Sequence, residues 1–394
     1  MPDKIKVAVN GYGVIGKRVA DAVRAQEDME LLGVSDVTTD YRVATAITQG
    51  IPVYASTEEA HQEMSAAGYP IAGKLPDLLD NVDVVVDCTP STIGAGNLDL
   101  YRTHGVKSVF QGGEKHSLTG HSFVAHANYS STLGRDTTRV VSCNTTGTVR
   151  TLIALQDAGL LSKARGVLVR RATDPWESDH SGIMNTIVPE GRIPSHQGPD
   201  AQSVVPDLDV VTMAAKGAHT HNHLHFWTIE LTRPADTEEV LEALKAMPRI
   251  AFVRRSDGIV AVNSTVELMR DLGRPRGDMY EVAIWEDILT VQGNELFWTY
   301  TVDNQAIVIP ENIDAIRALA GTVEDGDESI QRTDRALGVR GLFLTSVVDP
   351  VIAALRTRTA RGHVTIAQGG QSLPMLLVGW VESLVDQQPG IGAR

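Results

Sequence analysis

A glycine-rich turn near the N-terminus constrains the fold of this chain more than any other feature of the sequence. The apolar segment IKVAVN, residues 5–10, leads into the motif GYGVIG, residues 11–16, and the amphipathic segment KRVADAVRAQ follows. A G-x-G-x-x-G turn between a strand and a helix is typical of dinucleotide-binding βαβ units. Gly11 permits the tight turn, Gly13 lets the backbone approach a pyrophosphate, and Gly16 lets the helix pack on the strand. These residues predict a dinucleotide-binding domain of the Rossmann type.

An acidic residue at the end of the next apolar segment bears on which dinucleotide is bound. Asp36 lies twenty residues after Gly16 and closes the segment MELLGVSD. A carboxylate at this place can accept a hydrogen bond from the adenosine 2′-hydroxyl and repels a 2′-phosphate. We therefore favour NAD as the cofactor, with NADP as a possible alternative. The other interpretation is that Asp36 only caps its loop.

The pattern of apolar segments indicates two kinds of sheet. Up to about residue 142, short apolar runs such as DVVVDCTP alternate with helical patterns, which predicts a parallel, doubly wound sheet. Residues 143–305 carry longer, alternating segments such as HNHLHFWTIEL and LTVQGNELFWTYTV. These predict a mostly antiparallel sheet with helices on one face, as in an α+β catalytic domain. The fold class is therefore α/β, with a Rossmann domain (1–142) and this second domain.

Composition excludes several partners and compartments. The net charge is -14, which argues against nucleic acid, and neither a Lys/Arg cluster nor a long apolar run indicates a membrane. The two cysteines do not form a disulfide framework, and the N-terminus lacks a secretory signal pattern. We therefore expect a cytoplasmic protein with reduced thiols.

One of the cysteines lies at a junction suited to chemistry. Cys143, in VVSCNTTGTVRTL, separates an apolar strand from a predicted helix, and small polar residues follow it. A helix N-terminus lowers the pKa of a thiol, and Thr145 and neighbouring backbone amides could bind an anionic group there. The alternative is a buried small apolar residue, which is how we interpret Cys88 at the end of its apolar run. A nucleophilic thiolate beside a nicotinamide predicts aldehyde oxidation through a thiohemiacetal and a thioester.

Several ordered motifs between residues 4 and 340 resemble one family. NGYGVIGKRVADAV, QGGEK, SCNTTGTVRTL, IPSHQGPD and IPENIDAIRA are similar to motifs of the archaeal-type (type II) phosphorylating glyceraldehyde-3-phosphate dehydrogenases. The resemblance implies that phosphate cleaves the thioester of glyceraldehyde 3-phosphate and yields 1,3-bisphosphoglycerate. It also implies a homotetramer and a C-terminal helix, within residues 306–340, that returns to the Rossmann domain. Residues 341–394 extend beyond the usual family end and have no assigned role.

The resemblance also implies roles for individual residues. Cys143 matches the nucleophile. The implied substrate-binding residues are Ser142, Asn144, Thr145, Arg170, His196 and Gln197, and the implied cofactor-binding residues, beyond Gly11, Gly13, Gly16 and Asp36, are Val14, Ile15, Gly113, Arg171 and Asn304. The chain departs from the family pattern in two places, since Gln197 stands where the family has a second histidine and Asn304 where archaeal members often have glutamine.

A histidine run contains the expected general base. His219, His221, His223 and His225 alternate in AHTHNHLHF, and on a strand all four would share one face. The family has a His-x-His pair just before the segment that reads WTIEL here, which aligns with His223 and His225. We expect His223 to be the base, with His225 as the next candidate and His221 not excluded. A metal site is the less favoured interpretation, because neither a nearby cysteine nor an HExxH pattern accompanies the histidines.

Three other functions are compatible with parts of the sequence. A related phospho-aldehyde or semialdehyde dehydrogenase would share the cysteine and the dinucleotide turn. A non-catalytic NAD-binding protein would keep the turn but has no use for Cys143 beside a histidine run. A cysteine hydrolase would leave the dinucleotide turn unexplained.

Overall fold

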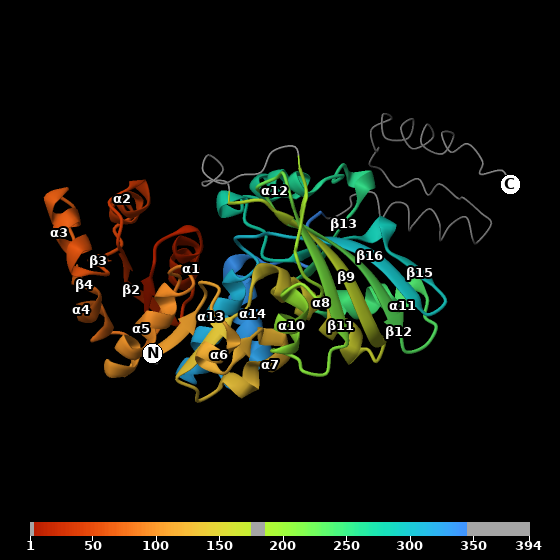
Figure 1. Cartoon of the computed structure of the whole chain (residues 1–394), viewed down its shortest axis with the longest axis horizontal. Helices are drawn as coiled ribbons and strands as arrows, with labels where there is room; N and C mark the ends of the chain where they lie inside the picture. The colour runs from red at the N-terminus through yellow and green to blue at the C-terminus, as the bar shows by residue number, and fades with distance from the viewer. Residues whose placement is uncertain (1–3, 175–185, 345–394) are drawn as a thin grey trace, which may run out of the picture. The chain divides into compact units, whose positions relative to one another are not determined.

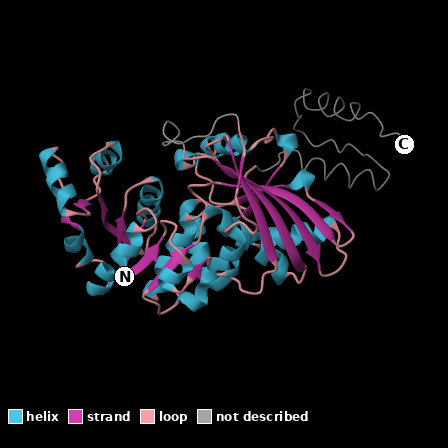
Figure 2. Ribbon diagram, in the orientation of Figure 1, coloured by secondary structure: helices cyan, strands magenta, loops and turns pink. Residues whose placement is uncertain are grey.

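The computed structural model describes residues 4–174 and 186–344. The chain divides into two compact units, residues 1–343 and 344–394, and the first unit contains two large sheets with their helices (Figures 1 and 2). Of the expected C-terminal extension, residues 341–394, the part from residue 345 onward lies outside the described residues.

The first sheet is parallel throughout and belongs to the N-terminal part of the chain. Its eight strands are β1 (Ile5–Asn10), β2 (Met29–Asp36), β3 (Val53–Ala55), β4 (Gly73–Lys74), β5 (Val84–Asp87), β6 (Lys107–Phe110), β7 (Ser122–Phe123) and β8 (Thr137–Val140). They are ordered β4-β3-β2-β1-β5-β6-β8-β7. All four residues of β5 are buried, which explains its continuous apolar pattern. The strand order reverses between β1 and β5, and ligands of such sheets bind at this point.

Short helices connect these strands. They are α1 (Val14–Arg24), α2 (Tyr41–Thr48), α3 (Glu58–Ala66), α4 (Leu75–Leu79), α5 (Ile93–Thr103), α6 (His116–Thr119), α7 (Ala125–Asn128) and the 3₁₀ turn η1 (Tyr129–Thr132). Helix α1 buries Val19, Ala20 and Val23 on one side, at the spacing that its sequence predicts.

The second sheet is mixed but mostly antiparallel. Its strands are β9 (Leu161–Arg171), β10 (Val188–Pro189), β11 (Val210–Gly217), β12 (His223–Leu231), β13 (Ile250–Val253), β14 (Val282–Trp285), β15 (Thr290–Gln292) and β16 (Glu295–Val302). The order is β10-β11-β9-β12-β16-β14-β13, with β15 on β16. Only the β9–β11 and β13–β14 pairs are parallel among the described pairs. Buried and accessible residues alternate along β12, so one face of the sheet is covered. The predicted fold class is thereby confirmed.

Helices cover that face and fill the connections. They are α8 (Cys143–Asp157), α10 (Gln197–Gln202), α11 (Thr237–Ala246) and α12 (Val262–Asp271), with 3₁₀ turns η3 (Arg255–Asp257), η4 (Pro275–Gly277) and η5 (Glu286–Ile288). Helix α8 packs against β9 and β16, and α11 packs against α8 (Figure 1).

Two helices, rather than one, follow the second sheet. Helix α13 (Ile309–Ala320) ends at Gly321, whose φ is +69°, and α14 (Gly326–Leu337) begins after the capping residue Asp325. Helix α13 packs against α1, β6 and β8 of the first sheet. Asn312 of α13 donates to the Gln111 side chain at 2.6 Å, and Arg317 pairs with Asp28 at 2.8 Å. This helix therefore completes the core of the N-terminal part.

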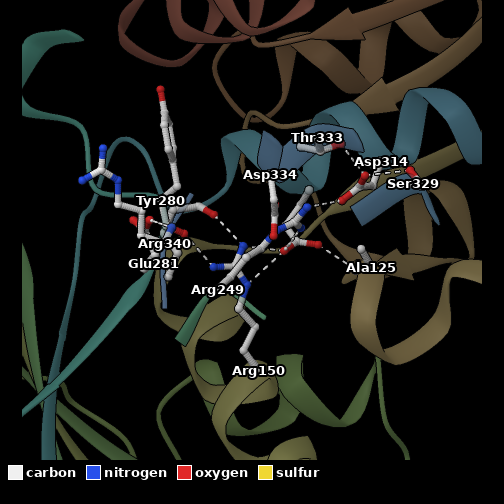
Figure 3. A network of polar contacts seen from close by, with 12 residues as sticks. Ala125, Arg150, Arg249, Tyr280, Glu281, Asp314, Ser329, Thr333, Asp334 and Arg340 are labelled. Atoms are coloured by element: carbon white, nitrogen blue, oxygen red, sulfur yellow. Dashed lines mark hydrogen bonds and ion pairs between the residues drawn. The ribbon is translucent and has the colours of Figure 1, made fainter. Parts of the chain in front are cut away.

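A buried ionic network joins α8 to these two helices (Figure 3). Arg150 of α8 donates through Nε to Glu311 of α13 at 3.0 Å. Arg249, just before β13, donates to Asp314 at 2.6 Å and to Asp334 of α14 at 2.7 Å. Because each of these charges has a buried partner, the network fixes the position of α8 relative to α13.

Candidate active site

Residues from both parts of the chain line a pocket of about 790 Å³. They include Ile15 of the dinucleotide turn and residues of the loop after β6, of the start of α8 and of the segment 192–203. Among the residues predicted from sequence, those on its wall are Ile15, Gly113, Ser142, Cys143, His196 and Asn304. The structure therefore brings the cofactor turn and the candidate nucleophile to one cavity.

The glycine turn has the geometry that a dinucleotide needs. Gly11 has a φ of +92°, and a Cβ on Gly16 would lie 1.8 Å from the carbonyl oxygen of Gly11. A Cβ on Gly13 would come no closer than 4.0 Å to any atom, the guanidinium of Arg42, so this side of the turn is open. No side chain caps α1, and its first turn carries no acidic residue. The turn and the helix N-terminus therefore fit a pyrophosphate group.

Asp36 is engaged by the protein itself. Its carboxylate accepts hydrogen bonds from the backbone N–H groups of Tyr12 at 2.7 Å, Val37 at 2.7 Å and Thr38 at 3.0 Å. A carboxylate has about four acceptor positions, so one remains for a ribose hydroxyl. The buried hydroxyl of Thr38 beside it has no partner among the described residues. Asp36 thus caps its loop, and one acceptor position of its carboxylate and the Thr38 hydroxyl stay open to a ligand among the described residues.

Cys143 lies at the N-terminus of α8, as predicted, but the helix already includes Cys143 and the small polar residues that follow it. Ser142 is the N-cap, and its hydroxyl accepts a hydrogen bond from the Thr145 amide at 3.3 Å. The expected lowering of the thiol pKa is not found. Burial raises the pKa of Cys143 to about 11, although Arg171, the Asn144 amide and Arg170 act in the opposite direction. The thiol of the free protein is therefore protonated at neutral pH, and a nucleophilic role would require a base that removes this proton.

Arg170 and Arg171 end β9 near this thiol. Arg170 pairs with Glu190 at 3.0 Å, and Arg171 pairs with Asp174 at 3.0 Å. The Nε of each arginine is buried without a partner among the described residues. Such donors suit a phosphate or carboxylate group of a ligand.

The four alternating histidines do not share one strand face. Strand β12 begins at His223, because Asn222 has a φ of +62°, which breaks the extended backbone. His219 and His221 lie in the preceding turn, and His219 contacts the Asn222 carbonyl oxygen through Nε2. Within residues 4–174 and 186–344, no three potential metal ligands come together.

His223 and His225 are both buried in β12. The Nδ1 atom of His223 accepts a hydrogen bond from the Arg171 amide at 3.0 Å, so its neutral ring carries the proton on Nε2. Burial, together with Arg171, lowers the pKa of His223 well below its usual range. The imidazole is therefore neutral at the pH of the cell.

Two predicted residues, Thr145 and Asn304, are held by other side chains, and a third, Gln197, is buried without such a contact among the described residues. Thr145 is fully buried and donates to Asp200 at 3.0 Å. Gln197 is also fully buried, and its amide has no partner among the described residues. Asn304 accepts from the Asn222 amide at 2.8 Å and donates to Asp174 at 2.9 Å, which leaves one lone pair and one N–H for a ligand.

The sequence interpretation missed a group of basic side chains on the pocket wall. Its members are Lys115, His116, Arg139 and Arg192. Arg139 of β8 is 5% exposed, donates to the Glu114 carbonyl oxygen at 3.0 Å and pairs with Asp200. The signal that could have revealed it is an arginine inside the apolar run that ends at Cys143.

Comparisons with known proteins agree with this arrangement. Residues 142–287 match the family model described as "Glyceraldehyde 3-phosphate dehydrogenase, C-terminal domain", and residues 5–113 match "Dihydrodipicolinate reductase, N-terminus". Proteins named glyceraldehyde-3-phosphate dehydrogenase are similar in sequence. The one from Methanobrevibacter smithii is 44% identical over 335 residues, and the one from Thermococcus kodakarensis is 45% identical over 336 residues. These alignments cover 84% and 85% of this chain and 99% of each relative.

A third relative, from Pyrococcus furiosus, is 44% identical over 336 residues, again with 85% of this chain and 99% of the relative covered. No helix in the described ranges combines the length and the apolarity that crossing a bilayer requires. The resemblance carried by the sequence motifs is confirmed at this level of identity, and the chain belongs to the glyceraldehyde-3-phosphate dehydrogenase family.

Proposed function

We propose that the protein catalyses the reversible, phosphorylating oxidation of D-glyceraldehyde 3-phosphate to 1,3-bisphosphoglycerate. The observation that carries the proposal is that Cys143 and the dinucleotide turn line the same pocket. The names of the relatives support the choice of substrate. In this proposal, residues 1–142 bind the cofactor, residues 143–305 carry the chemistry, and residues 306–340 return to the cofactor-binding part.

The proposed reaction starts when the sulfur of Cys143 attacks the aldehyde carbon of the substrate, while the S–H bond breaks and its proton moves to the aldehyde oxygen. The thiohemiacetal that forms carries its oxygen beside the start of α8. A bound nicotinamide would accept the hydride from that carbon, which leaves a thioester on Cys143. Inorganic phosphate then attacks the thioester carbon, the C–S bond breaks, and the acyl phosphate leaves with Cys143 as a thiolate.

His223 is the proposed acceptor of the hydroxyl proton of the thiohemiacetal. Its neutral imidazole suits a proton acceptor, and its position next to Arg171 in the sheet supports the choice. In the structure its Nδ1 lone pair is used by the Arg171 amide, so the base role requires this contact to open during the cycle. If the contact persists, His223 acts instead as a donor, through Nε2–H, to the developing oxyanion.

Basic side chains on the pocket wall are the proposed phosphate ligands. They are His196 and the cluster of Lys115, His116, Arg139 and Arg192, which line the same pocket as Cys143. The buried Nε donors of Arg170 and Arg171, near Cys143, have no partner within residues 4–174 and 186–344. The substrate phosphate and the attacking phosphate both carry negative charge, which these groups can stabilise. We also propose substrate-site roles for Ser142 and Asn144, which flank the nucleophile.

NAD is the favoured cofactor in this proposal. The Asp36 carboxylate keeps one acceptor position and a negative charge where a 2′-phosphate would lie. The guanidinium of Arg42 lies near the turn at Gly13 and is paired with Asp40. It could also bind a 2′-phosphate, so the proposal includes NADP as a second cofactor. Asn304, with its spare donor and acceptor, is the proposed contact of the nicotinamide carboxamide.

The proposed assembly is a homotetramer in the cytoplasm. Met213, Val167 and Phe226 are adjacent on β11, β9 and β12, and each is more than 40% exposed. Such a row of apolar side chains on an uncovered sheet face supports burial against another subunit.

The test of this function measures NADH formation from glyceraldehyde 3-phosphate and NAD. The proposal expects a rate that depends on phosphate or arsenate, and it expects Cys143→Ala to abolish the rate while cofactor binding persists. Cys88→Ala is the matched control, because Cys88 packs in the core and should leave the rate nearly unchanged. Persistent NADH formation in Cys143→Ala, or a preference for an unrelated semialdehyde, would contradict the proposal.

A further inference from the structure

We propose that His225 is a positioning residue that acts through Asn144 on the sulfur of Cys143. Three contacts form a chain to the sulfur: Tyr300 Oη to His225 Nδ1 at 3.0 Å, His225 Nε2 to Asn144 Oδ1 at 2.8 Å, and Asn144 Nδ2 to Cys143 Sγ at 3.9 Å. The inference rests on the proposed function only in taking Cys143 as the nucleophile.

The sheet register places the first two members of this chain. His225 of β12 and Tyr300 of β16 are directly opposite each other in the antiparallel ladder, and their ring centroids are 4.7 Å apart. Both side chains are fully buried, and Asn144 is 3% exposed. Because α8 packs on this face of the sheet, its first turn meets the His225 ring. Hydrogen bonds in such a dry place hold a fixed geometry better than those in water.

The donor and acceptor roles along the chain follow from chemistry. A neutral imidazole has one donor and one acceptor, and a side-chain amide oxygen can only accept. Nε2 of His225 therefore donates to Asn144, and Nδ1 accepts from the Tyr300 hydroxyl. This arrangement turns the amide N–H of Asn144 toward sulfur. The reverse arrangement would place the amide oxygen against the sulfur, which is unfavourable once the sulfur is a thiolate.

The same arrangement excludes His225 as the base. In this tautomer Nε2 carries the proton and cannot accept another one. The lone pair of Nδ1 already accepts a hydrogen bond from the Tyr300 hydroxyl. Burial lowers the pKa of His225 to about 3, which agrees with a ring that stays neutral during catalysis. The charged groups that act on the thiol are Arg171, Arg170 and Asp174. Asn144 adds an N–H donor that points toward the sulfur, and His225 holds the Asn144 side chain in this orientation.

The test is the pH dependence of alkylation of Cys143 by iodoacetamide, measured on the full chain without substrate. Peptide mass analysis separates Cys143 from Cys88. His225→Leu should slow alkylation near neutral pH about tenfold, which corresponds to an upward shift of about one unit in the thiol pKa. His225→Gln should restore most of the rate, because its amide can also donate to Asn144. A general base could not be replaced by glutamine.

A double-mutant cycle separates this role from a structural one. In an Asn144→Ala background, His225→Leu should have no further effect on the alkylation rate, because the group through which it acts is gone. A full tenfold effect in that background overturns the proposal, as does a folded His225→Gln protein that alkylates as slowly as His225→Leu.

If His225→Leu does not fold, Tyr300→Phe replaces it in the test. This variant loses the hydroxyl that fixes the tautomer of His225 but keeps the packing of the aromatic ring. An unchanged alkylation profile of Tyr300→Phe would then refute the proposed chain of contacts. The proposed function can fail without the His225 proposal failing. If full alkylation of Cys143 leaves NADH formation intact, the nucleophile is wrong, yet the alkylation profile still reports on His225.

Discussion

The guanidinium of Arg150 lies against the carboxylate of Glu311 with both side chains fully buried. This pair connects the helix that begins at Cys143 with the helix that closes the first sheet. Burial alone would raise the pKa of Glu311, but Arg150 and Arg249 outweigh it and hold that pKa at about 2. The carboxylate is therefore ionised at every pH at which the protein works.

Arg150→Met should destabilise the protein by about 3–5 kcal/mol, because it leaves a buried charge network short of one cation. Urea unfolding followed by fluorescence measures this change. Arg332→Met is the matched control, since Arg332 is 43% exposed and pairs with Glu328 four residues earlier in α14. We expect less than about 0.5 kcal/mol there. Equal losses in the two variants would show that burial of the pair does not matter.

Substitutions in the glycine turn should separate folding from cofactor binding. Gly16→Ala places a Cβ 1.8 Å from the Gly11 carbonyl oxygen and should destabilise the fold. Gly13→Ala meets only the tip of Arg42 at 4.0 Å, and Gly13 has a φ of -78°, which alanine tolerates. The second variant should keep its thermal midpoint but raise the KM for NAD about tenfold or more, because its methyl group occupies the space of the pyrophosphate. An unchanged KM would exclude this turn as the pyrophosphate site.

Cofactor choice should respond to charge near the ribose site. Asp36→Asn removes the negative charge that a 2′-phosphate would meet, so the ratio of NADP to NAD efficiency should rise about five- to tenfold. Arg42→Ala should lower NADP use and leave NAD use nearly unchanged. Steady-state kinetics with both cofactors gives the ratios, and thermal unfolding checks that the Asp36 loop survives. A ratio that stays constant in Asp36→Asn would mean that the residue only caps its loop.

The protein should lose stability as the pH falls below about 6.5, the ordinary pKa of a histidine. Burial lowers the pKa values of His126 and His225 to about 3 and that of His121 to about 4. The unfolded chain takes up these protons near pH 6.5 and the folded chain does not, so acid favours unfolding. Each imidazole costs up to about 1.4 kcal/mol per pH unit between pH 6.5 and its folded pKa.

Urea midpoints at pH 7, 6 and 5 measure this slope. His126→Gln should reduce the slope by about one proton. A slope that is the same in His126→Gln as in the parent protein would show that this imidazole takes up its proton in the folded state.

Local patterns in the sequence predict the parts of the site that depend on short stretches of chain. The GYGVIG turn and the apolar runs of β1 and β5 predict the first sheet, and the placement of Cys143 at a helix start follows from the residues around it. The single predicted C-terminal helix is two helices, because Gly321 ends α13 in a left-handed conformation.

The remaining features depend on residues that are distant in sequence. The raised pKa of Cys143 results from burial by several segments, which no local pattern reveals. Arg139 lines the pocket because Asp200 of α10 and the backbone of Glu114, in the loop after β6, hold it there. The contact of His225 with Asn144 joins residues 81 positions apart and depends on the packing of α8 against the sheet.

Helix α13 has a consequence for how this protein is made. The Ala125 amide donates to Glu311, and Asn312 contacts Gln111, so a segment synthesised late completes the core of the part synthesised first. While the ribosome adds residues 143–308, the nascent N-terminal part exposes the apolar surface that α13 will cover. Cells that overproduce the protein should therefore depend on chaperones until translation passes α13.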